Sequence, residues 1–183
     1  VRKAYEPLRK SVIGEPLFER KNTRDNTPAI LHVELVEGEA CRFVVGAKGF
    51  GAENMSRARL LPPAAGIEGV KQEVLEVVEN AGPNACPPIV VGVGLGGTLE
   101  VCSYLAKKAL MREVGERHPD SRYAELEAEL LDLVNKTGIG AQGIGGVVTA
   151  LDVRVEYAPT HIGSLPIAVN LDCHLQRKIR FSL

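Results

Sequence analysis

The sequence predicts a single mixed α/β domain that spans residues 1–183. Three segments carry apolar residues at every third or fourth position, which is the pattern of an amphipathic helix. Other segments alternate between apolar and polar residues or form short apolar runs, as strands do. The sequence shows no internal repeat, low-complexity tract or linker, so helices and strands are expected to interleave around one core.

The first third of the chain is expected to combine irregular segments with one β-hairpin. Residues 1–28 are polar and rich in turn-forming residues after a short helix-like start. The stretch AILHVELV (29–36) alternates between apolar and polar residues, which predicts a half-buried strand. Gly38 would turn this strand into a hairpin partner at CRFVVGA (41–47). Residues 48–63 then read as a glycine-punctuated loop that ends at two prolines.

Three amphipathic helices are predicted. The first ends at Gly82-Pro83, the second is expected to be capped by Thr98, and the third by Ser121. Each has one apolar stripe that is expected to face the core. The predicted inward positions are, helix by helix, Ile67, Val70, Val74, Val77 and Ala81; Leu99, Cys102, Leu105, Ala106 and Ala109; and Tyr123, Leu126, Leu130 and Val134.

Further strands are predicted between and after these helices. PIVVGV (88–93) is short and wholly apolar, so it is expected to be covered on both faces of the sheet. TGIGAQGIGG (137–146) is a second glycine loop, and VVTALDVRVEY (147–157) returns to strand alternation after it. SLPIAVNLDC (164–173) is a further strand candidate.

The composition is that of an ordinary soluble globular protein. The chain has 183 residues, of which 45% are hydrophobic and 25% charged. A net charge of -1 argues against a nucleic-acid or anionic-membrane surface as the main partner. No apolar run reaches transmembrane length or resembles a secretory signal, so a cytoplasmic location is expected. The first residue is Val1 rather than Met, which predicts a fragment or a processed product.

The cysteines show no pattern of a common metal or redox motif. Their spacing is irregular and contains no C-x-x-C pair, so zinc-ribbon and thioredoxin-type sites are disfavoured. A disulfide scaffold is also disfavoured in a chain of this size without a secretory signal. Each cysteine would by default be a small buried apolar residue. The four are Cys41, Cys86, Cys102 and Cys173.

The stretch ACPPIVVGVGLGG (85–97) allows two functional interpretations. Gly92, Gly94 and Gly97 match the G-x-G-x-x-G dinucleotide fingerprint, between an apolar run and a helix-like run. That fingerprint requires a second strand with an acidic residue about 20 positions later, whereas two helical segments follow here. An NAD-binding oxidoreductase is therefore disfavoured but stays an alternative. The glycines could equally serve close packing of a helix on a strand.

The same stretch places Cys86 on a stiff support. Pro87 and Pro88 follow it, fix the backbone and remove two amide donors. A strand begins directly afterwards, so the sulfur is expected at the end of a strand. That position suits a cysteine that acts as a ligand better than one that packs in the core. A single cysteine of this kind is nevertheless more often structural.

Four stretches in this order resemble the α-subunit of class I fumarases and L-tartrate dehydratases, the iron–sulfur hydro-lyases. The resemblance covers nearly the whole chain, and the combination of the CPP motif with the glycine loops is specific. The stretches are AKGFGAENMS (47–56), GPNACPPIVVGVGLGG (82–97), TGIGAQGIGG (137–146) and APTHIGSLPIAVNLDCHLQR (158–177).

The resemblance implies a [4Fe–4S] cluster bound by three cysteines, with one iron left free for substrate. Cys86 matches the second ligand and Cys173 the third, while Cys41 and Cys102 match none and are expected to pack in apolar surroundings. The family's first ligand lies in a Cys-Gln-Asp-Thr-Gly motif upstream of the position of Arg9, and this sequence contains no such motif. The chain therefore resembles an N-terminally incomplete α-subunit.

The resemblance also implies substrate contacts. Arg9 matches an arginine that grips a substrate carboxylate, a role that suits its planar two-pronged donor. Gly51 matches a glycine whose backbone amide meets the substrate, and Lys48 and Asn54 flank it, with Lys48 as a further substrate-binding candidate. His161 matches a histidine that lines the site and is the catalytic candidate of this chain.

The activity that the resemblance implies is the reversible hydration of fumarate to L-malate, a reaction of the tricarboxylic acid cycle. Dehydration of L-tartrate to oxaloacetate is the alternative. Gln142 would support the site from the second glycine loop. A β-subunit or C-terminal domain would supply the catalytic base, in a dimer of αβ units, so the isolated chain is expected to be inactive. A scaffold that has lost its cluster is the non-catalytic alternative.

Overall fold

The computed structural model describes residues 1–183 and confirms the mixed α/β class. The main sheet consists of β2 (Arg57–Leu61), β3 (Ile89–Gly96), β4 (Ala150–Ala158) and β5 (Leu165–Asp172), in the order β2-β5-β3-β4. β3 runs parallel to β4 and antiparallel to β5, which is antiparallel to β2. Every residue of β3 is buried, as the wholly apolar run predicted.

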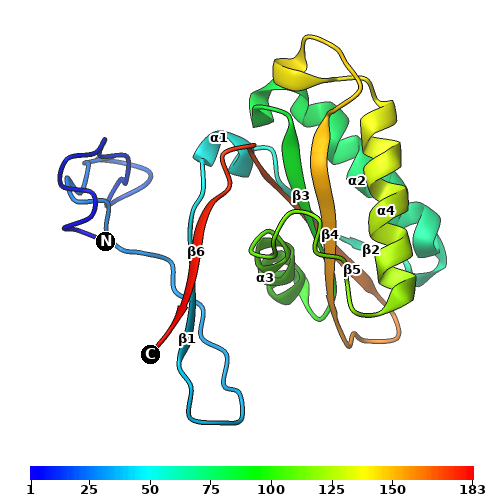
Figure 1. The fold of residues 1–183 in the computed structure, drawn as a ribbon, viewed down its shortest axis with the longest axis horizontal. Coiled ribbons are helices and arrows are strands. Elements are labelled where there is room, and N and C mark those ends of the chain that lie inside the picture. Colours follow the sequence, from blue (N-terminus) through cyan, green and yellow to red (C-terminus); the bar gives the residue numbers. More distant parts are fainter. The chain divides into compact units, whose positions relative to one another are not determined.

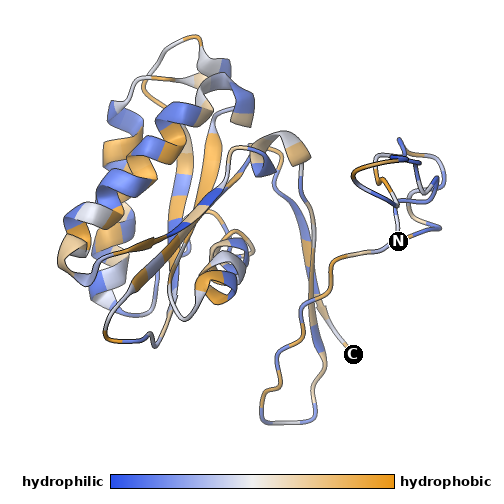
Figure 2. Ribbon diagram, turned by 180° about the vertical axis from the view of Figure 1, so that it is seen from behind, coloured by the Kyte–Doolittle hydropathy of each residue, from blue (hydrophilic) through white to orange (hydrophobic).

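Helices cover both faces of this sheet (Figure 1). They are α2 (Gly66–Ala81), α3 (Leu99–Ala109) and α4 (Ser121–Lys136), which match the three helices predicted from apolar spacing. The apolar stripes of α2 and α4 join Val91 and Val93 of β3 in the main core. On the other face, α3 packs against the sheet through Cys102 and Ala106, which contact Ala168. Figure 2 shows hydrophobic stripes along these helices and hydrophobic strands between them.

The glycines of β3 permit an unusually close approach of α3. A Cβ atom at Gly92 would lie 2.1 Å from the carbonyl oxygen of Ala106, and one at Gly94 would lie 2.0 Å from that of Cys102. Both glycines lie inside the strand, whereas a dinucleotide fingerprint uses glycines in the turn after the strand. The structure therefore supports close helix–strand packing as the reason for these glycines and gives no support to the nucleotide interpretation.

Most of the predicted inward positions of the helices are buried. On α2, Val70, Val74, Val77 and Ala81 are at most 4% exposed. Two predictions are wrong, because Ile67 is 61% exposed and Leu99 is 46% exposed. Both residues lie in the first turn of their helix. The buried stripe of α2 and of α3 thus begins about one turn later than the spacing alone indicates.

The helix caps also differ in detail from the prediction. Asp120, not Ser121, is the N-cap of α4, and its side chain accepts a hydrogen bond from the backbone amide of Arg122. Thr98 does occupy the N-cap position of α3 but makes no capping hydrogen bond with its side chain. A carboxylate satisfies the free amides of a first turn as well as a hydroxyl does, so a sequence with adjacent Asp and Ser leaves the choice open.

A second sheet contains only two strands, β1 (Arg42–Ala47) and β6 (Arg177–Ser182), paired antiparallel. The rings of Phe43 and Phe181 stack across the pair with their centroids 4.9 Å apart. On the opposite face of this ribbon, the side chain of Arg180 donates to the carbonyl of Met111 in the segment after α3. The ribbon is thus tied to the main body by one of its faces.

The predicted hairpin of residues 29–36 with 41–47 is wrong. Residues 29–36 form no strand, and their apolar side chains are exposed, with Leu35 at 96%. The strand β1 pairs instead with β6, whose sequence RKIRFS was not predicted as a strand. Three of its six residues are basic, which obscures the alternation of apolar and polar side chains that indicates a strand. In addition, no local pattern indicates that two segments so distant in the chain pair with each other.

The predicted loop 48–63 contains two further elements, the four-residue helix α1 (Phe50–Glu53) and strand β2. The arginines of β2 masked its strand character. Arg57 donates to Glu73 at 2.6 Å and to Glu76 at 2.8 Å, so α2 neutralises this charge at the edge of the sheet. A short 3-10 turn, η1 (Pro63–Ala65), then leads into α2.

A buried ion pair joins α4 to the strand and loop beside it. The carboxylate of Glu127 is fully buried and accepts from Arg112 Nη1 at 2.7 Å. It also accepts from the backbone amides of Val155 and His118, each at 2.9 Å. Because β4 is an edge strand, the bond to Val155 satisfies an amide that has no partner strand.

The chain divides into two compact units, Val1–Ala40 and Cys41–Leu183, and one domain over residues 1–183 stays a prediction. The first unit contains no helix or strand beyond a single bridge between Ile13 and Asn22. Within this unit, Asn26 is 8% exposed, and its side chain accepts from the amide of Ser11.

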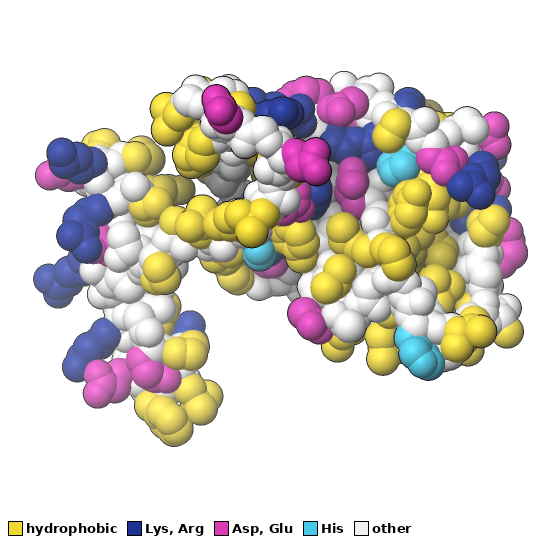
Figure 3. Space-filling view, turned by 90° about the horizontal axis from the view of Figure 1, so that it is seen from below, with side chains coloured by type: hydrophobic (Ala, Val, Ile, Leu, Met, Phe, Trp, Pro, Cys, Tyr) yellow, Lys and Arg dark blue, Asp and Glu magenta, His cyan; other side chains and the backbone are white.

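No helix anywhere in residues 1–183 is both long and apolar enough to cross a membrane. Positive and negative side chains are interspersed on the face in Figure 3.

Candidate functional site

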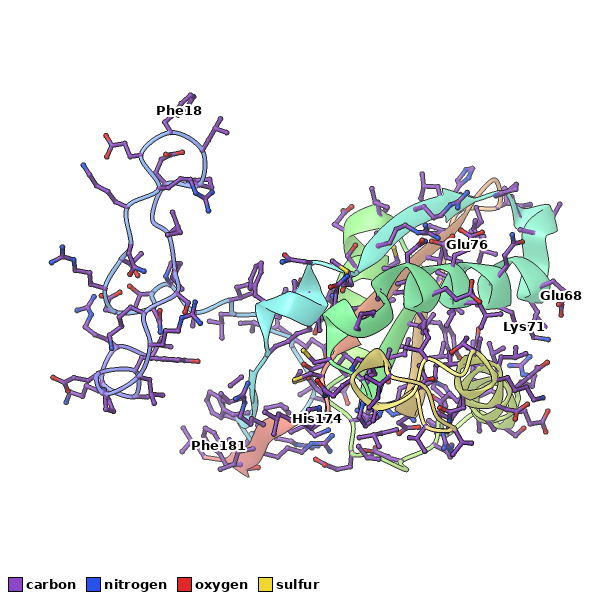
Figure 4. All side chains as sticks on the ribbon, turned by 90° about the horizontal axis from the view of Figure 1, so that it is seen from above. Phe18, Glu68, Lys71, Glu76, His174 and Phe181 are labelled. Atoms are coloured by element: carbon purple, nitrogen blue, oxygen red, sulfur yellow. The ribbon has the colours of Figure 1, made fainter.

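Cys86 and Cys173 lie at the same end of the main sheet, which we call the cysteine end. Cys86 precedes β3, and Cys173 follows the last residue of β5, Asp172, which pairs with Val90 near the start of β3. His174, the next residue after Cys173, places its ring Nδ1 3.4 Å from the carbonyl oxygen of Cys86. The two cysteine turns therefore adjoin, as the turns of two ligands to one cluster must. Figure 4 shows His174 close to the strand that carries Phe181.

Cys86 has an unusual backbone conformation. It ends the short 3-10 turn η2 (Gly82–Ala85) with φ 55° and ψ 61°, in the left-handed region. Its amide donates to the carbonyl of Pro83 at 3.0 Å, and its side chain is exposed and free of any disulfide. A left-handed residue with a side chain costs about 1–2 kcal/mol, and such strain is concentrated at functional positions.

The second glycine loop supports the turn of Cys86. It contains the short 3-10 turn η3 (Ala141–Gly143). The backbone amide and the side-chain amide of Gln142 both donate to the carbonyl of Pro87, at 2.8 and 3.0 Å. A Cβ at Gly143 would lie 2.6 Å from that of Pro83, so only glycine fits there. Gln142 therefore holds Pro87, the residue next to Cys86.

The first glycine loop passes beside both cysteine turns. A Cβ at Gly49 would lie 4.0 Å from the sulfur of Cys173, and one at Gly51 would lie 3.6 Å from the carbonyl oxygen of Asn84. Helix α1 carries Gly51, so its backbone faces the turn of Cys86. Asn54 follows α1 and lines a separate cleft of about 220 Å³ between residues 54–57 and the end of α2.

One carboxylate links the first glycine loop to α3. Glu53 forms ion pairs with Lys48 and with Lys107, each at 2.7 Å. Although partial burial raises the pKa of Glu53, the two ammonium groups lower it to about 2. Lys48 is therefore not a free cation, since Glu53 neutralises it. Two ammonium groups and one carboxylate still leave one net positive charge beside the cysteine end.

Sequence reasoning missed Asp172 and Gln176. The carboxylate of Asp172 accepts from the amide of Cys173 at 3.0 Å and from the side-chain amide of Gln176 at 2.8 Å. Burial raises the pKa of Asp172, while the charge of Lys48 opposes this rise. Both residues belong to the stretch DCHLQR, in which only the cysteine matches a ligand position of the family.

The structure does not bring His161 to the cysteine end. The neighbouring Thr160 donates from its hydroxyl to the carbonyl of Gly97 at 3.0 Å, and Gly97 donates to Pro159 at 3.1 Å, so this loop lies where β3 ends. At about 3.3 Å per residue, the length of β3 separates it from Cys86 by more than about 20 Å. Figure 1 shows the β4–β5 loop at the opposite end of the sheet.

The expectation that His161 shares one cavity with the two cysteines therefore fails within this chain. His161 is exposed, and its Nδ1 accepts from the amide of Gly163 at 3.1 Å. That contact is an ordinary loop hydrogen bond. The cause of the error is topological, because His161 and Cys173 flank β5 and a strand carries its two ends apart.

The remaining predicted positions have mixed outcomes. Cys102 is fully buried, as predicted, and burial raises the pKa of its thiol. Cys41 is exposed at the start of the ribbon, so its predicted apolar packing is wrong. Arg9 lies in the first unit, with its side chain exposed and its carbonyl accepting from Asn26 at 2.8 Å. Its role as a substrate ligand stays a prediction.

The donor set of the cysteine end is incomplete for a metal. No three side chains of His, Cys, Asp or Glu in residues 1–183 are grouped closely enough to hold an ion. Two free thiols lie on adjoining turns, and the absence of a side chain at Gly49 leaves space beside one sulfur, since a Cβ there would lie 4.0 Å from it. This arrangement fits a cluster that takes a further thiolate from outside this chain.

The chain is similar in sequence to proteins of one family. Residues 1–182 match the family model described as fumarate hydratase (Fumerase). The chain is 46% identical, over 97% of its length and 64% of the relative's, to the "Putative L(+)-tartrate dehydratase subunit alpha" of Methanocaldococcus jannaschii. It is 34% identical to the L(+)-tartrate dehydratase subunit alpha of Escherichia coli strain K12, over 94% of this chain and 57% of that protein. The chain thus spans less than two thirds of either relative.

Proposed function

Because this chain belongs to the fumarate hydratase (Fumerase) family, we propose that it is part of the α-subunit of a hydro-lyase. The reaction would add water to, or remove it from, a four-carbon dicarboxylate. The observation that supports this most strongly is the meeting of the Cys86 and Cys173 turns beside the first glycine loop. No other end of the sheet gathers free thiols in this chain.

The cysteine end fits a [4Fe–4S] cluster held by Cys86, Cys173 and one thiolate from outside this chain. Such a cluster, when bound, supplies an iron that acts as a Lewis acid on the substrate's hydroxyl and carboxylate. The strained turn of Cys86 and the carboxylate-bound turn of Cys173 would hold the two thiolates ready for it.

The residues around the cysteine end can bind an anionic substrate. Lys48 and Lys107 outnumber Glu53 by one charge at the first glycine loop, and Arg177 and Lys178 act on the buried Asp172 beside it. Positive groups therefore outnumber these two carboxylates, which favours binding of a substrate carboxylate. The backbone of Gly51 has no side chain to block its approach to a ligand, which suits the expected amide contact. The dicarboxylate needs a second charged partner for its other end, and the role that the resemblance implies for Arg9 stays a prediction.

The proton donor or acceptor must come from elsewhere. The one histidine beside the cysteine end in sequence, His174, is already engaged with the carbonyl of Cys86, and His161 lies at the other end of the sheet. Both named relatives are alpha subunits, so we propose a β-subunit that closes over the cysteine end and supplies the base. Closure would also exclude water and strengthen each charged contact.

Two substrates are candidates. The family description names fumarate hydratase, which favours interconversion of fumarate and L-malate. The names of both relatives favour L-tartrate. The two differ by hydroxyl groups, and a site built to hydrogen-bond a hydroxyl strongly rejects a substrate without it.

The test is activity of the complete αβ enzyme after anaerobic reconstitution, with L-malate and L-tartrate assayed in parallel. We expect turnover of one substrate, its loss in Cys86→Ser, and its retention in Cys41→Ser, which also removes an exposed free thiol. Full activity of Cys86→Ser would contradict the proposal. Turnover by this chain without a β-subunit would place the base among its own residues.

A further inference from the structure

The turn that carries Cys173 is closed by one buried carboxylate. Asp172 is 5% exposed. One of its oxygens accepts from the Cys173 amide at 3.0 Å, and the other accepts from Gln176 Nε2 at 2.8 Å. The same side chain thus binds the residue directly after it and the residue at the far side of the turn.

The carboxylate is linked in turn to the segment after α3. Lys178 donates to the side-chain oxygen of Gln176 at 3.4 Å and to the backbone carbonyl of Arg112. Its side chain is only 7% exposed. A chain of polar contacts therefore runs from Asp172 through Gln176 and Lys178 to the segment after α3. The turn is thus bound to the end of β5 on one side and to that segment on the other.

Apart from the contact between the His174 ring and the carbonyl of Cys86, few bonds fix this turn. It belongs to no helix or strand, and its own backbone supplies only short contacts, from Gln176 to His174 and from Arg177 to Leu175. The strand that follows, β6, pairs only with β1, and a two-stranded ribbon is marginally stable by itself. The position of the Cys173 sulfur therefore depends on the two hydrogen bonds of Asp172 together with the contact of His174.

We propose that Asp172 and Gln176 are positioning residues that hold the Cys173 thiolate in the geometry its cluster requires. This inference rests on the function proposed above. Ligands must be held within about 0.5 Å of their productive positions, and residues that orient a ligand typically contribute about 10- to 100-fold in metal affinity. The negative charge of Asp172 beside a thiolate is offset by Lys48, Arg177 and Lys178, which all act on it electrostatically.

The chain offers a matched control for the Gln176 bond. Gln72 on α2 also donates from its side-chain amide to a carboxylate, that of Glu76, at 3.1 Å. Gln176→Met and Gln72→Met therefore remove the same kind of bond, one beside Cys173 and one remote from it. Asp172→Asn supplies a conservative rescue, since its oxygen can still accept from Cys173 and its amide can donate to a rotated Gln176.

The first measurement is the half-life of the reconstituted cluster in the αβ enzyme under an iron chelator. We expect Gln176→Met to shorten it about tenfold, Asp172→Ala at least as much, and Asp172→Asn and Gln72→Met far less. The thermal unfolding midpoints of the two Met variants should match. Equal half-lives for Gln176→Met and Gln72→Met would overturn the proposal, and so would a loss of cluster that merely follows a lower unfolding midpoint.

The second measurement needs no cluster. The apoprotein is alkylated with iodoacetamide, and the rate at each cysteine is read by mass spectrometry, with exposed Cys41 as the internal reference. Gln176→Met should change the rate at Cys173 several-fold relative to Cys41, and Gln72→Met should not. An unchanged ratio would overturn the proposal. If the wild-type enzyme binds no cluster, the proposed function fails, and the alkylation ratio still decides whether Asp172 and Gln176 hold Cys173.

Discussion

The ring Nδ1 of His174 lies 3.4 Å from the carbonyl oxygen of Cys86. This contact joins the turn before β3 to the turn after β5, and it places the two cysteines that the family resemblance selected beside each other. Neighbouring loops then add the first glycine loop and Gln142. The proposal for a cluster site depends on this convergence rather than on any single motif.

The strained backbone of Cys86 predicts that one substitution can abolish cluster binding and leave the stability of the fold almost unchanged. Glycine adopts φ 55° without the cost that a side chain incurs. We expect Cys86→Gly to change the free energy of unfolding by no more than about 1 kcal/mol, while it removes the thiolate. Urea denaturation of the apoprotein and iron analysis of the reconstituted enzyme measure the two effects. A loss of more than about 2 kcal/mol would show that the Cys86 side chain is needed for the fold itself.

The contact between α3 and β3 predicts that Gly94→Ala is destabilising. Its new Cβ would lie 2.0 Å from the carbonyl oxygen of Cys102, a backbone atom that cannot move without shifting the helix. We expect a loss of about 1–3 kcal/mol or more in the free energy of unfolding. Gly14→Ala is the control, because its Cβ would meet other atoms only at 3.7 Å. A stable, folded Gly94→Ala protein that had lost NAD binding would restore the nucleotide interpretation.

The buried carboxylate of Glu127 predicts a large effect on stability. Glu127→Ala would leave Arg112 without its partner at 2.7 Å and the amides of Val155 and His118 without acceptors. Removing one member of a buried pair typically costs about 3–5 kcal/mol. Glu125, exposed on the same helix, is the control, and Glu125→Ala should fall within about 0.5 kcal/mol of wild type. Similar urea midpoints for the two variants would contradict the structure of this network.

The depressed pKa of Glu53 predicts an acid-dependent loss of stability. Its pKa is lowered from 4.5 to about 2, so folding favours the ionised form. The contribution of the ionised Glu53 to the free energy of unfolding is fully present above pH 4.5 and is lost as the pH falls towards 2. When the pH is lowered from about 6 to about 3, urea denaturation should therefore show a smaller decrease in the free energy of unfolding for Glu53→Gln than for wild type. The effect is screened because Glu53 is partly exposed, and parallel pH profiles would show that the pairs with Lys48 and Lys107 contribute nothing.

Much of the main sheet and its helices could be predicted from local pattern. The stripe of Val70, Val74 and Val77 and the apolar run of β3 need only their own periodicity, because both elements bury a face against the same core. The pairing of β1 with β6 could not be predicted in this way. It joins Phe43 to Phe181 across almost the whole second unit, and no local signal carries that information.

The candidate site could be predicted only in part, because local motifs identify residues but not which distant segments meet. The family motifs identified Cys86 and Cys173, and the structure places their turns together. Motif order does not say which end of a strand a loop occupies, so His161 was expected beside Cys173 although β5 separates them. Asp172 was overlooked because a carboxylate beside a cysteine reads as an ordinary surface acid until its burial and its two hydrogen bonds are known.

The measurement that tests the central claim most directly is the iron and acid-labile sulfide content of the complete αβ enzyme after anaerobic reconstitution. The wild-type enzyme and Cys41→Ser should retain equal amounts, because Cys41 is exposed at the ribbon and is not among the proposed ligands. Cys86→Ser and Cys173→Ser should each lose most of the iron, since a [4Fe–4S] cluster depends on its thiolates. Undiminished iron and sulfide in both Cys86→Ser and Cys173→Ser would contradict the cluster site at the cysteine end.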